Sequence, residues 1–145
     1  MLIVRHAKAS DIIPVIALAF ETLPERYNPV IFNQFYETSP DDFLVALHNN
    51  SIVGFLIGIK TTSTIARILM LSVKERNRKQ GIGTALLKVF LTEMKEHQIK
   101  RLDLEVRTTN HAALEFYKKQ GFILRGILPQ FYQNGEDAYS MTKEL

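Results

Sequence analysis

A basic stretch with two glycines is the first place where this sequence could bind a ligand. RNRKQGIGTALL, residues 76–87, follows an apolar segment typical of a strand and continues as one typical of a helix. Gly81 and Gly83 would let backbone N–H groups approach a ligand closely, and the helix N-terminus and the basic side chains would favour an anion. The stretch therefore predicts a pyrophosphate-binding loop. The alternative is a solvated basic turn whose glycines serve packing alone.

Charged and apolar residues alternate in a second stretch, RLDLEVR, residues 101–107. Successive side chains of a strand point to opposite faces, so Asp103, Glu105 and Arg107 would share one face. A half-exposed edge strand could carry such a face without any site. An interior strand could carry it only beside a cleft, and the position of this segment between two crossover helices favours the interior strand.

Composition excludes several classes of protein. The 145 residues are enough for one domain with a substantial core, so we expect a single domain over residues 1–145. With 46% hydrophobic and 23% charged residues and no long apolar run, the chain is typical of a soluble globular protein that does not span a membrane. The N-terminus lacks the order of a signal peptide, which favours a cytoplasmic location.

The residue types and the net charge also limit which cofactors and partners the chain could bind. The chain has no cysteine, so disulfides and thiolate catalysis are excluded, and the spacing of its four histidines predicts no metal site. The net charge of +3 is modest, and the basic residues do not alternate with aromatic ones as in proteins that bind single-stranded nucleic acid. A small anionic ligand fits this charge better than a nucleic acid does.

The pattern of hydrophobic residues predicts the elements that would position these stretches. Strands are expected at residues 2–7, 43–48, 52–60, 64–73, 101–107, 122–128 and 136–145. Helices are expected after a Ser10 cap, after Asn28-Pro29, over residues 81–96, and from an Asn110 cap to Gly121. This order joins an antiparallel half, with a turn at Asn49-Asn50, to a crossover half. It predicts an α/β fold with a mixed, mostly antiparallel central sheet and helices on both faces.

Two motifs in these elements resemble a known family. Arg78-x-x-Gly81-x-Gly83 after an apolar strand is similar to the acetyl-CoA signature of the GNAT family of N-acetyltransferases, and LEVRTTNHAALEFYKKQGF, residues 104–122, resembles a second stretch of that family. The first motif is neither a P-loop nor a Rossmann fingerprint. The resemblance implies the GNAT fold and acetyl-CoA as the acetyl donor. It implies coenzyme contacts at Leu71, Val73, Arg78, Lys79, Gln80, Gly81, Ile82, Gly83, Thr84 and Asn110, although Asn110 could also simply cap its helix.

Acetyl transfer needs a base for the attacking amine and an acid for the departing thiolate. By the resemblance, Glu105 would be the base and Tyr117 the acid, since a phenol of ordinary pKa ~10 can protonate a leaving thiolate. A tyrosine packed in the core is the structural alternative for Tyr117. The absence of cysteine favours direct attack in a ternary complex over a covalent enzyme intermediate.

Two further stretches indicate the acceptor. LPERYNPVIF, residues 23–32, and FYQNGEDAYSMTKEL, residues 131–145, resemble protein N-terminal acetyltransferases of the RimI and NatA catalytic-subunit types. The resemblance implies substrate contacts at Leu23, Pro24, Glu25, Tyr27 and Tyr132. Three residues depart from the common pattern of these enzymes: Arg26, Phe131 and Glu105. The eukaryotic catalytic subunit has a histidine where Glu105 stands. Glu25 is therefore a second candidate carboxylate.

The resemblance implies protein N-termini as substrates, together with an auxiliary subunit or ribosome association. Three alternatives remain open on the sequence. The acceptor could be an internal lysine or a small-molecule amine, and the chain could instead be a non-catalytic acyl-CoA-binding module. An α-amine has a pKa of ~7.7–8.0 against ~10.4 for lysine, so it is more readily available in its neutral form.

Overall fold

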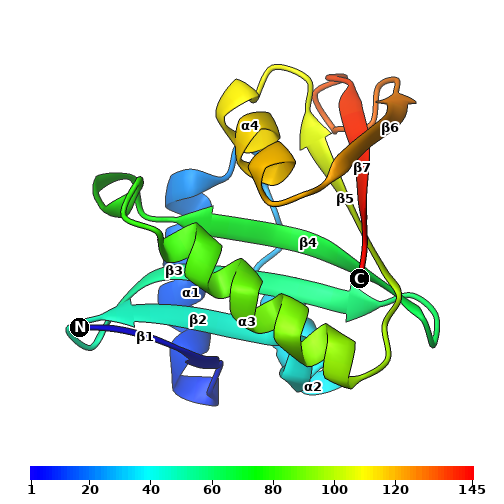
Figure 1. The fold of residues 1–145 in the computed structure, drawn as a ribbon. Coiled ribbons are helices and arrows are strands. Elements are labelled where there is room, and N and C mark those ends of the chain that lie inside the picture. The colour runs from blue at the N-terminus through cyan, green and yellow to red at the C-terminus, as the bar shows by residue number, and fades with distance from the viewer.

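A seven-stranded mixed sheet forms the centre of the computed structural model, which describes all residues from Met1 to Leu145 (Figure 1). The strand order is β1-β2-β3-β4-β5-β7-β6. The strands are β1 (Leu2–His6), β2 (Phe43–His48), β3 (Ser51–Lys60), β4 (Ile65–Val73), β5 (Arg101–Arg107), β6 (Ile123–Leu128) and β7 (Ala138–Glu144). The helices are α1 (Ile12–Thr22), α2 (Val30–Thr38), α3 (Ile82–Glu96) and α4 (His111–Lys119), and three short 3-10 turns are η1 (Ala9–Asp11), η2 (Pro40–Asp42) and η3 (Glu75–Asn77).

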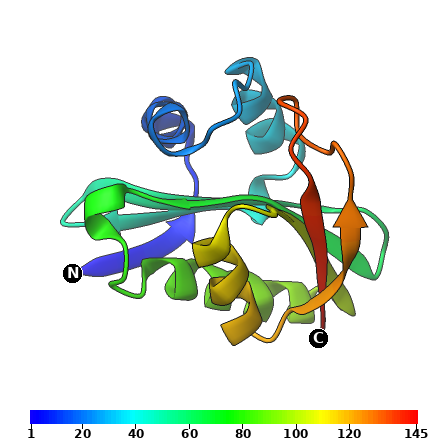
Figure 2. The same ribbon diagram turned by 90° about the horizontal axis from the view of Figure 1, so that it is seen from above.

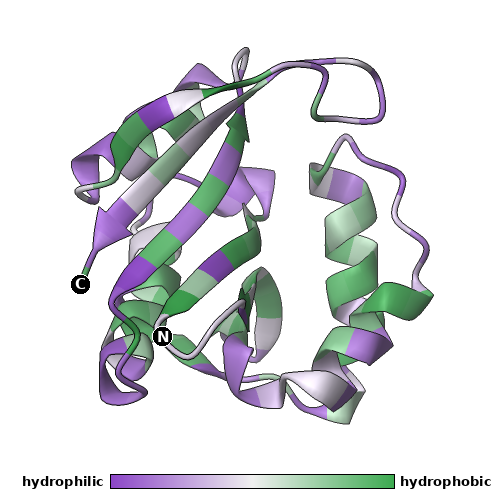
Figure 3. Cartoon of the chain, turned by 90° about the vertical axis from the view of Figure 1, so that its right-hand side faces the viewer, coloured by the Kyte–Doolittle hydropathy of each residue, from purple (hydrophilic) through white to green (hydrophobic).

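The helices form two layers on opposite faces of the sheet. Figure 2 shows α1 and α2 on one face and α3 and α4 on the other. Each layer has its own hydrophobic core: Val15 and Phe32 pack with the sheet on the first face, and Leu86, Phe90 and Leu104 on the second. The strands β2 and β3, which are covered on both faces, are buried along most of their length, whereas hydrophilic and hydrophobic residues alternate along β5 (Figure 3). The predicted fold class is confirmed.

The first four strands pair antiparallel, and β2, β3 and β4 form the predicted meander. Asn49 and Asn50 connect β2 to β3 with positive φ angles of 51° and 69°, as a tight two-residue hairpin turn requires. The pairing of β3 with β4 shifts register between Ile57 and Gly58. Such an irregularity changes the local direction of β4. It lies close to the point where β4 stops pairing with β5.

The strands β4 and β5 pair in parallel over a short length and then diverge. Only the residues from Ile65 to Arg67 pair with those from Arg101 to Asp103. Beyond this point β5 still pairs with β7 along its whole length, but its edge toward β4 has no partner strand. Figure 1 shows the two strands separating. The divergence leaves backbone N–H and C=O groups on both edges available to a ligand.

Helix ends follow the sequence signals with one exception. Asn110 Oδ1 accepts a hydrogen bond of 3.1 Å from the Ala113 N–H, and Gly121 has φ 91° after α4, so both predictions are confirmed. The predicted Ser10 cap is wrong. Ser10 lies within η1, and the Asp11 carboxylate instead accepts a 2.7 Å bond from the Lys8 N–H while it pairs with Arg5. None of the helices combines the length and the apolar character that crossing a lipid bilayer demands.

Replacing Gly58 by alanine tests the packing of α3 on the sheet. A Cβ at Gly58 would lie 2.4 Å from Cζ of Phe90, whose side chain is fully buried, so either the ring or the strand must move. We expect the free energy of unfolding, measured in urea, to fall by about 1–3 kcal/mol. Gly126→Ala is the matched control, because a Cβ there meets no atom within 4 Å and should change stability little. Equal stabilities of the two variants would contradict the packing described.

Candidate active site

The opening between β4 and β5 leads into a cavity of about 500 Å³. Its walls come from the end of α1 with Leu23 and Pro24 after it, the end of β4, the loop before α3, the first turn of α3 and one face of α4. The predicted coenzyme residues that line it are Leu71, Val73, Arg78, Lys79, Gly81, Ile82, Gly83, Thr84 and Asn110. Gln80 does not line it. Its side chain turns back toward the loop, with Nε2 3.5 Å from the Arg76 carbonyl oxygen.

Local backbone geometry makes the loop before α3 suitable for an anion. Lys79 and Gly81 have positive φ angles of 62° and 82°, and Gly81 stands at the N-terminal end of α3 without a side-chain cap. The N–H groups of the first helical turn therefore have no partner within the helix. The Arg78 guanidinium donates a 3.1 Å bond to the Val73 carbonyl, which holds the loop against β4. Backbone donors, the helix dipole and nearby cations together can bind a phosphate group.

Asn77 is a residue of this cavity that the sequence reasoning missed. Its Oδ1 atom is buried without a hydrogen-bond partner, and the residue lines the cavity. A buried acceptor of this kind is suited to a donor on a bound ligand. The only signal in the sequence is its position beside Arg78, within the basic stretch.

A second, smaller cavity of about 150 Å³ joins the first. Leu71, Asn110 and Tyr117 line both cavities, so the two meet between β4 and α4. All predicted substrate residues line the second cavity: Leu23, Pro24, Glu25, Tyr27 and Tyr132. Glu105 lines it as well. Segments far apart in the sequence thus meet at this second cavity, the slot.

Tyr117 stands where the two cavities meet. It lies on α4, is 8% exposed, and packs edge to face against Phe116 and Phe122. Burial, and to a lesser degree the charge of Tyr132 when ionised, raises the pKa of the Tyr117 phenol well above its ordinary value. The residue is therefore both a core tyrosine and a cavity residue, and its hydroxyl stays protonated at neutral pH.

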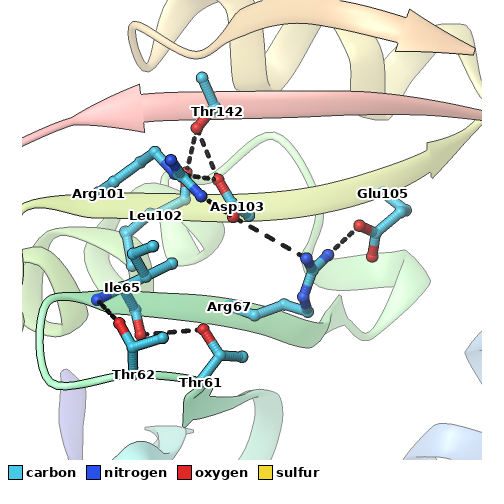
Figure 4. A network of polar contacts seen from close by, with 9 residues as sticks. All are labelled: Thr61, Thr62, Ile65, Arg67, Arg101, Leu102, Asp103, Glu105 and Thr142. Atoms are coloured by element: carbon cyan, nitrogen blue, oxygen red, sulfur yellow. Dashed lines mark hydrogen bonds and ion pairs between the residues drawn. The ribbon is translucent and has the colours of Figure 1, made fainter.

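Glu105 extends from the charged face of β5 and forms an ion pair with Arg67 of β4 (Figure 4). Two residues earlier on the same face, Asp103 accepts bonds of 3.0 and 3.1 Å from Arg101 and of 2.7 Å from the Thr142 hydroxyl. Burial alone would raise the pKa of Asp103, but the bonds from Thr142 and Arg101 outweigh it and lower the pKa below its ordinary value. The sequence reasoning missed Arg67, although a lone cation in the apolar stretch TIARILMLSV was a signal.

Arg107 joins the two loops that border the slot. Its guanidinium pairs with Glu25 of the α1–α2 loop and, at 2.8 Å, with Glu136 of the loop before β7. It also lies 4.0 Å above the ring of Tyr132. The sequence predicted Arg107 on the charged face of its strand but indicated no role for it in the site.

Both slot tyrosines stay neutral in this environment. Burial and the nearby Glu25 carboxylate raise the pKa of Tyr132 to about 12, although Arg107 opposes the shift. The same two causes raise the pKa of Tyr27. Their hydroxyls can therefore donate hydrogen bonds to a substrate across the physiological pH range.

The whole chain is similar to known proteins. An N-alpha-acetyltransferase of Saccharolobus solfataricus is 32% identical over 153 residues, covering 97% of this chain and 92% of the relative. The crystal structure of Ard1 from Thermoplasma volcanium has a TM-score of 0.96 at 36% identity, covering 99% of this chain and 97% of that one. Naa20 of Chaetomium thermophilum, solved with a bisubstrate analogue, has a TM-score of 0.89 at 26% identity, covering 99% and 86%.

The match to a family model covers most of the chain. Residues 12–122 match the model described as the acetyltransferase (GNAT) family. This range contains both motifs on which the resemblance rested, and the sheet around them has the fold of the solved relatives. The chain belongs to the acetyltransferase (GNAT) family.

Proposed function

We propose that this acetyltransferase moves the acetyl group of acetyl-CoA to the α-amino group at the N-terminus of a protein chain, by direct attack in a ternary complex. The observation that carries the proposal is the junction of two cavities at Tyr117, one lined by the glycine-containing loop and the other by the slot residues. A donor and an acceptor that enter from the two sides would meet between the diverging strands. The relatives named N-alpha-acetyltransferase support the same acceptor.

The larger cavity fits coenzyme A. The loop from Arg78 to Thr84 supplies backbone donors and positive charge for the pyrophosphate. The exposed edge of β4 at Leu71 and Val73 offers backbone groups of the kind that bind the amides of the pantetheine arm. A backbone N–H on this edge would also polarise the thioester carbonyl.

Glu105 is the proposed base. An α-amine with a pKa of ~7.7–8.0 is partly neutral at pH 7, so one carboxylate is enough to take the proton released on attack. The Glu105 side chain lines the slot and is only 14% exposed. Glu25, the other carboxylate of the slot, is held by Arg107, which also binds Glu136.

Tyr117 is the proposed donor to the leaving sulfur. Its raised pKa means that the phenol holds its proton more tightly than a thiol does. A hydrogen bond that stabilises the developing thiolate fits this group better than the complete proton transfer expected from an ordinary phenol.

The slot accounts for a chain terminus as the acceptor. Its volume is only about 150 Å³, and Arg107 binds the loop after α1 to the loop before β7 across it. A terminal residue can enter such a slot end first, whereas an internal lysine must bring the chain on both of its sides. Cytoplasmic location, an auxiliary subunit and ribosome association stay predictions.

A peptide panel tests the acceptor. The purified chain is incubated with acetyl-CoA and peptides that have a free or a blocked N-terminus, each with and without an internal lysine. We expect acetyl only on the α-amine of the free peptides, located by fragmentation mass spectrometry. Acetyl on lysine, or on a small amine alone, would overturn the N-terminal acceptor.

Glu105→Gln tests the base. The substitution keeps the size of the side chain but removes the carboxylate, so kcat should fall by about 100-fold or more while the Kd for acetyl-CoA is unchanged. Thiol release measures the rate. Glu115→Gln, on the exposed face of α4, is the control. An unaltered rate across the pH range would remove Glu105 from this role.

Tyr117→Phe tests the donor to sulfur. Loss of one hydroxyl aimed at developing charge should lower kcat by roughly 10- to 1000-fold, with little change in fold because the ring is retained. Tyr36→Phe on α2, away from both cavities, should leave kcat unchanged. A variant as fast as the wild type would leave Tyr117 a packing residue only.

A further inference from the structure

Arg67 lies where the strands β4 and β5 separate. It is the last β4 residue that pairs with β5, opposite Asp103. Its neighbours Ala66 and Ile68 are buried in the core under α3, so the Arg67 side chain points to the other face. Glu105 lies two residues further along β5, where no strand pairs with that edge. The guanidinium therefore crosses the opening between the strands.

Arg67 is itself held in place from β5. Its Nη2 lies 3.9 Å from Asp103, while Nη1 donates to Oε2 of Glu105. Asp103 is fixed in turn by the two bonds from Arg101 and by the hydroxyl of Thr142 on β7 (Figure 4). A planar guanidinium between two carboxylates on one strand face has few alternative orientations.

We infer that Arg67 is a positioning residue for the reaction: it fixes the Glu105 carboxylate through Oε2 and leaves Oε1 to take the proton of the attacking amine. Arg67 does not line the slot, whereas Glu105 does, so Arg67 acts on the substrate only through Glu105. The inference rests on the proposed function, because it assigns a support to the base named there.

The charges of Arg67 and Glu105 also support the positioning role. A largely buried carboxylate without a partner is costly, and a guanidinium stays charged at any pH at which the enzyme works. Arg67 is itself 31% exposed, and a pair this open to solvent contributes little to stability. Its effect should therefore be on the geometry and charge of Glu105 rather than on the fold.

A double-mutant cycle tests the inference. Arg67→Met, Glu105→Gln and the double variant are compared with the wild type for kcat, KM for acetyl-CoA, and melting temperature, using free N-terminal peptides. We expect Arg67→Met to lower kcat by roughly ten- to a hundredfold with KM for acetyl-CoA unchanged, since small misplacement of a reacting group costs this much. In the Glu105→Gln background the same change should have no further effect. Arg67→Lys, which keeps the charge, should recover part of the rate.

Arg5→Met is the matched control, since it breaks a comparable ion pair between Arg5 on the distant strand β1 and Asp11 in η1. Like Arg67→Met it should change the melting temperature little, but unlike Arg67→Met it should leave kcat unchanged. Multiplicative effects of Arg67→Met and Glu105→Gln, or an Arg67→Met variant with the kcat of the wild type, would overturn the inference and leave the proposed function intact. A wild-type chain that acetylates no N-terminus would instead overturn the proposed function, and the positioning role with it.

Discussion

The short parallel pairing of β4 with β5 is the constraint on which the rest of the site depends. After Arg67 and Asp103 the two strands separate, although β5 remains fully paired with β7 and β4 with β3. A sheet interior cannot leave backbone donors and acceptors unmatched without cost. The groups at the opening are therefore available to water or to a ligand, and the second cavity is lined by both strand edges while the first continues along the end of β4.

Arginines on each side of this opening balance its carboxylates. Arg67 pairs with Glu105 and Arg107 pairs with Glu25, so each carboxylate of the slot has a cation from a different element. The slot is thus charged but nearly neutral in sum. An incoming amine meets carboxylates whose orientation is fixed, which lowers the reorganisation that proton transfer would otherwise require.

The sequence predicted the elements well because hydrophobic period and turn chemistry are local properties. The alternation in RLDLEVR, the Asn49-Asn50 turn and the Asn110 cap each depend on a few neighbouring residues and are confirmed. The Ser10 cap was wrong because the 3-10 turn η1 precedes α1 and contains Ser10, and Asp11 rather than Ser10 accepts a backbone bond, from the Lys8 N–H. The family and the acetyltransferase class are also confirmed.

The sequence could not predict the distances between segments that lie far apart in the chain. The divergence of β4 from β5 depends on register, and the pairs of Arg67 and Arg107 depend on which strands become neighbours. Gln80 was carried over for the backbone amide of its loop, and that role stays a prediction, whereas its side chain bonds back to the Arg76 carbonyl and does not line the cavity. The roles of the site residues stay predictions.

The tight Asn49-Asn50 connection also bears on the order in which the molecule assembles. The β2–β3–β4 meander closes through short loops, so its contacts carry a small loop-closure entropy and should form early. The parallel contact of β4 with β5 must wait for a crossover that contains all of α3, and it then supplies only three residue pairs. The opening between β4 and β5 is therefore expected among the last regions to become ordered and the first to open in hydrogen exchange.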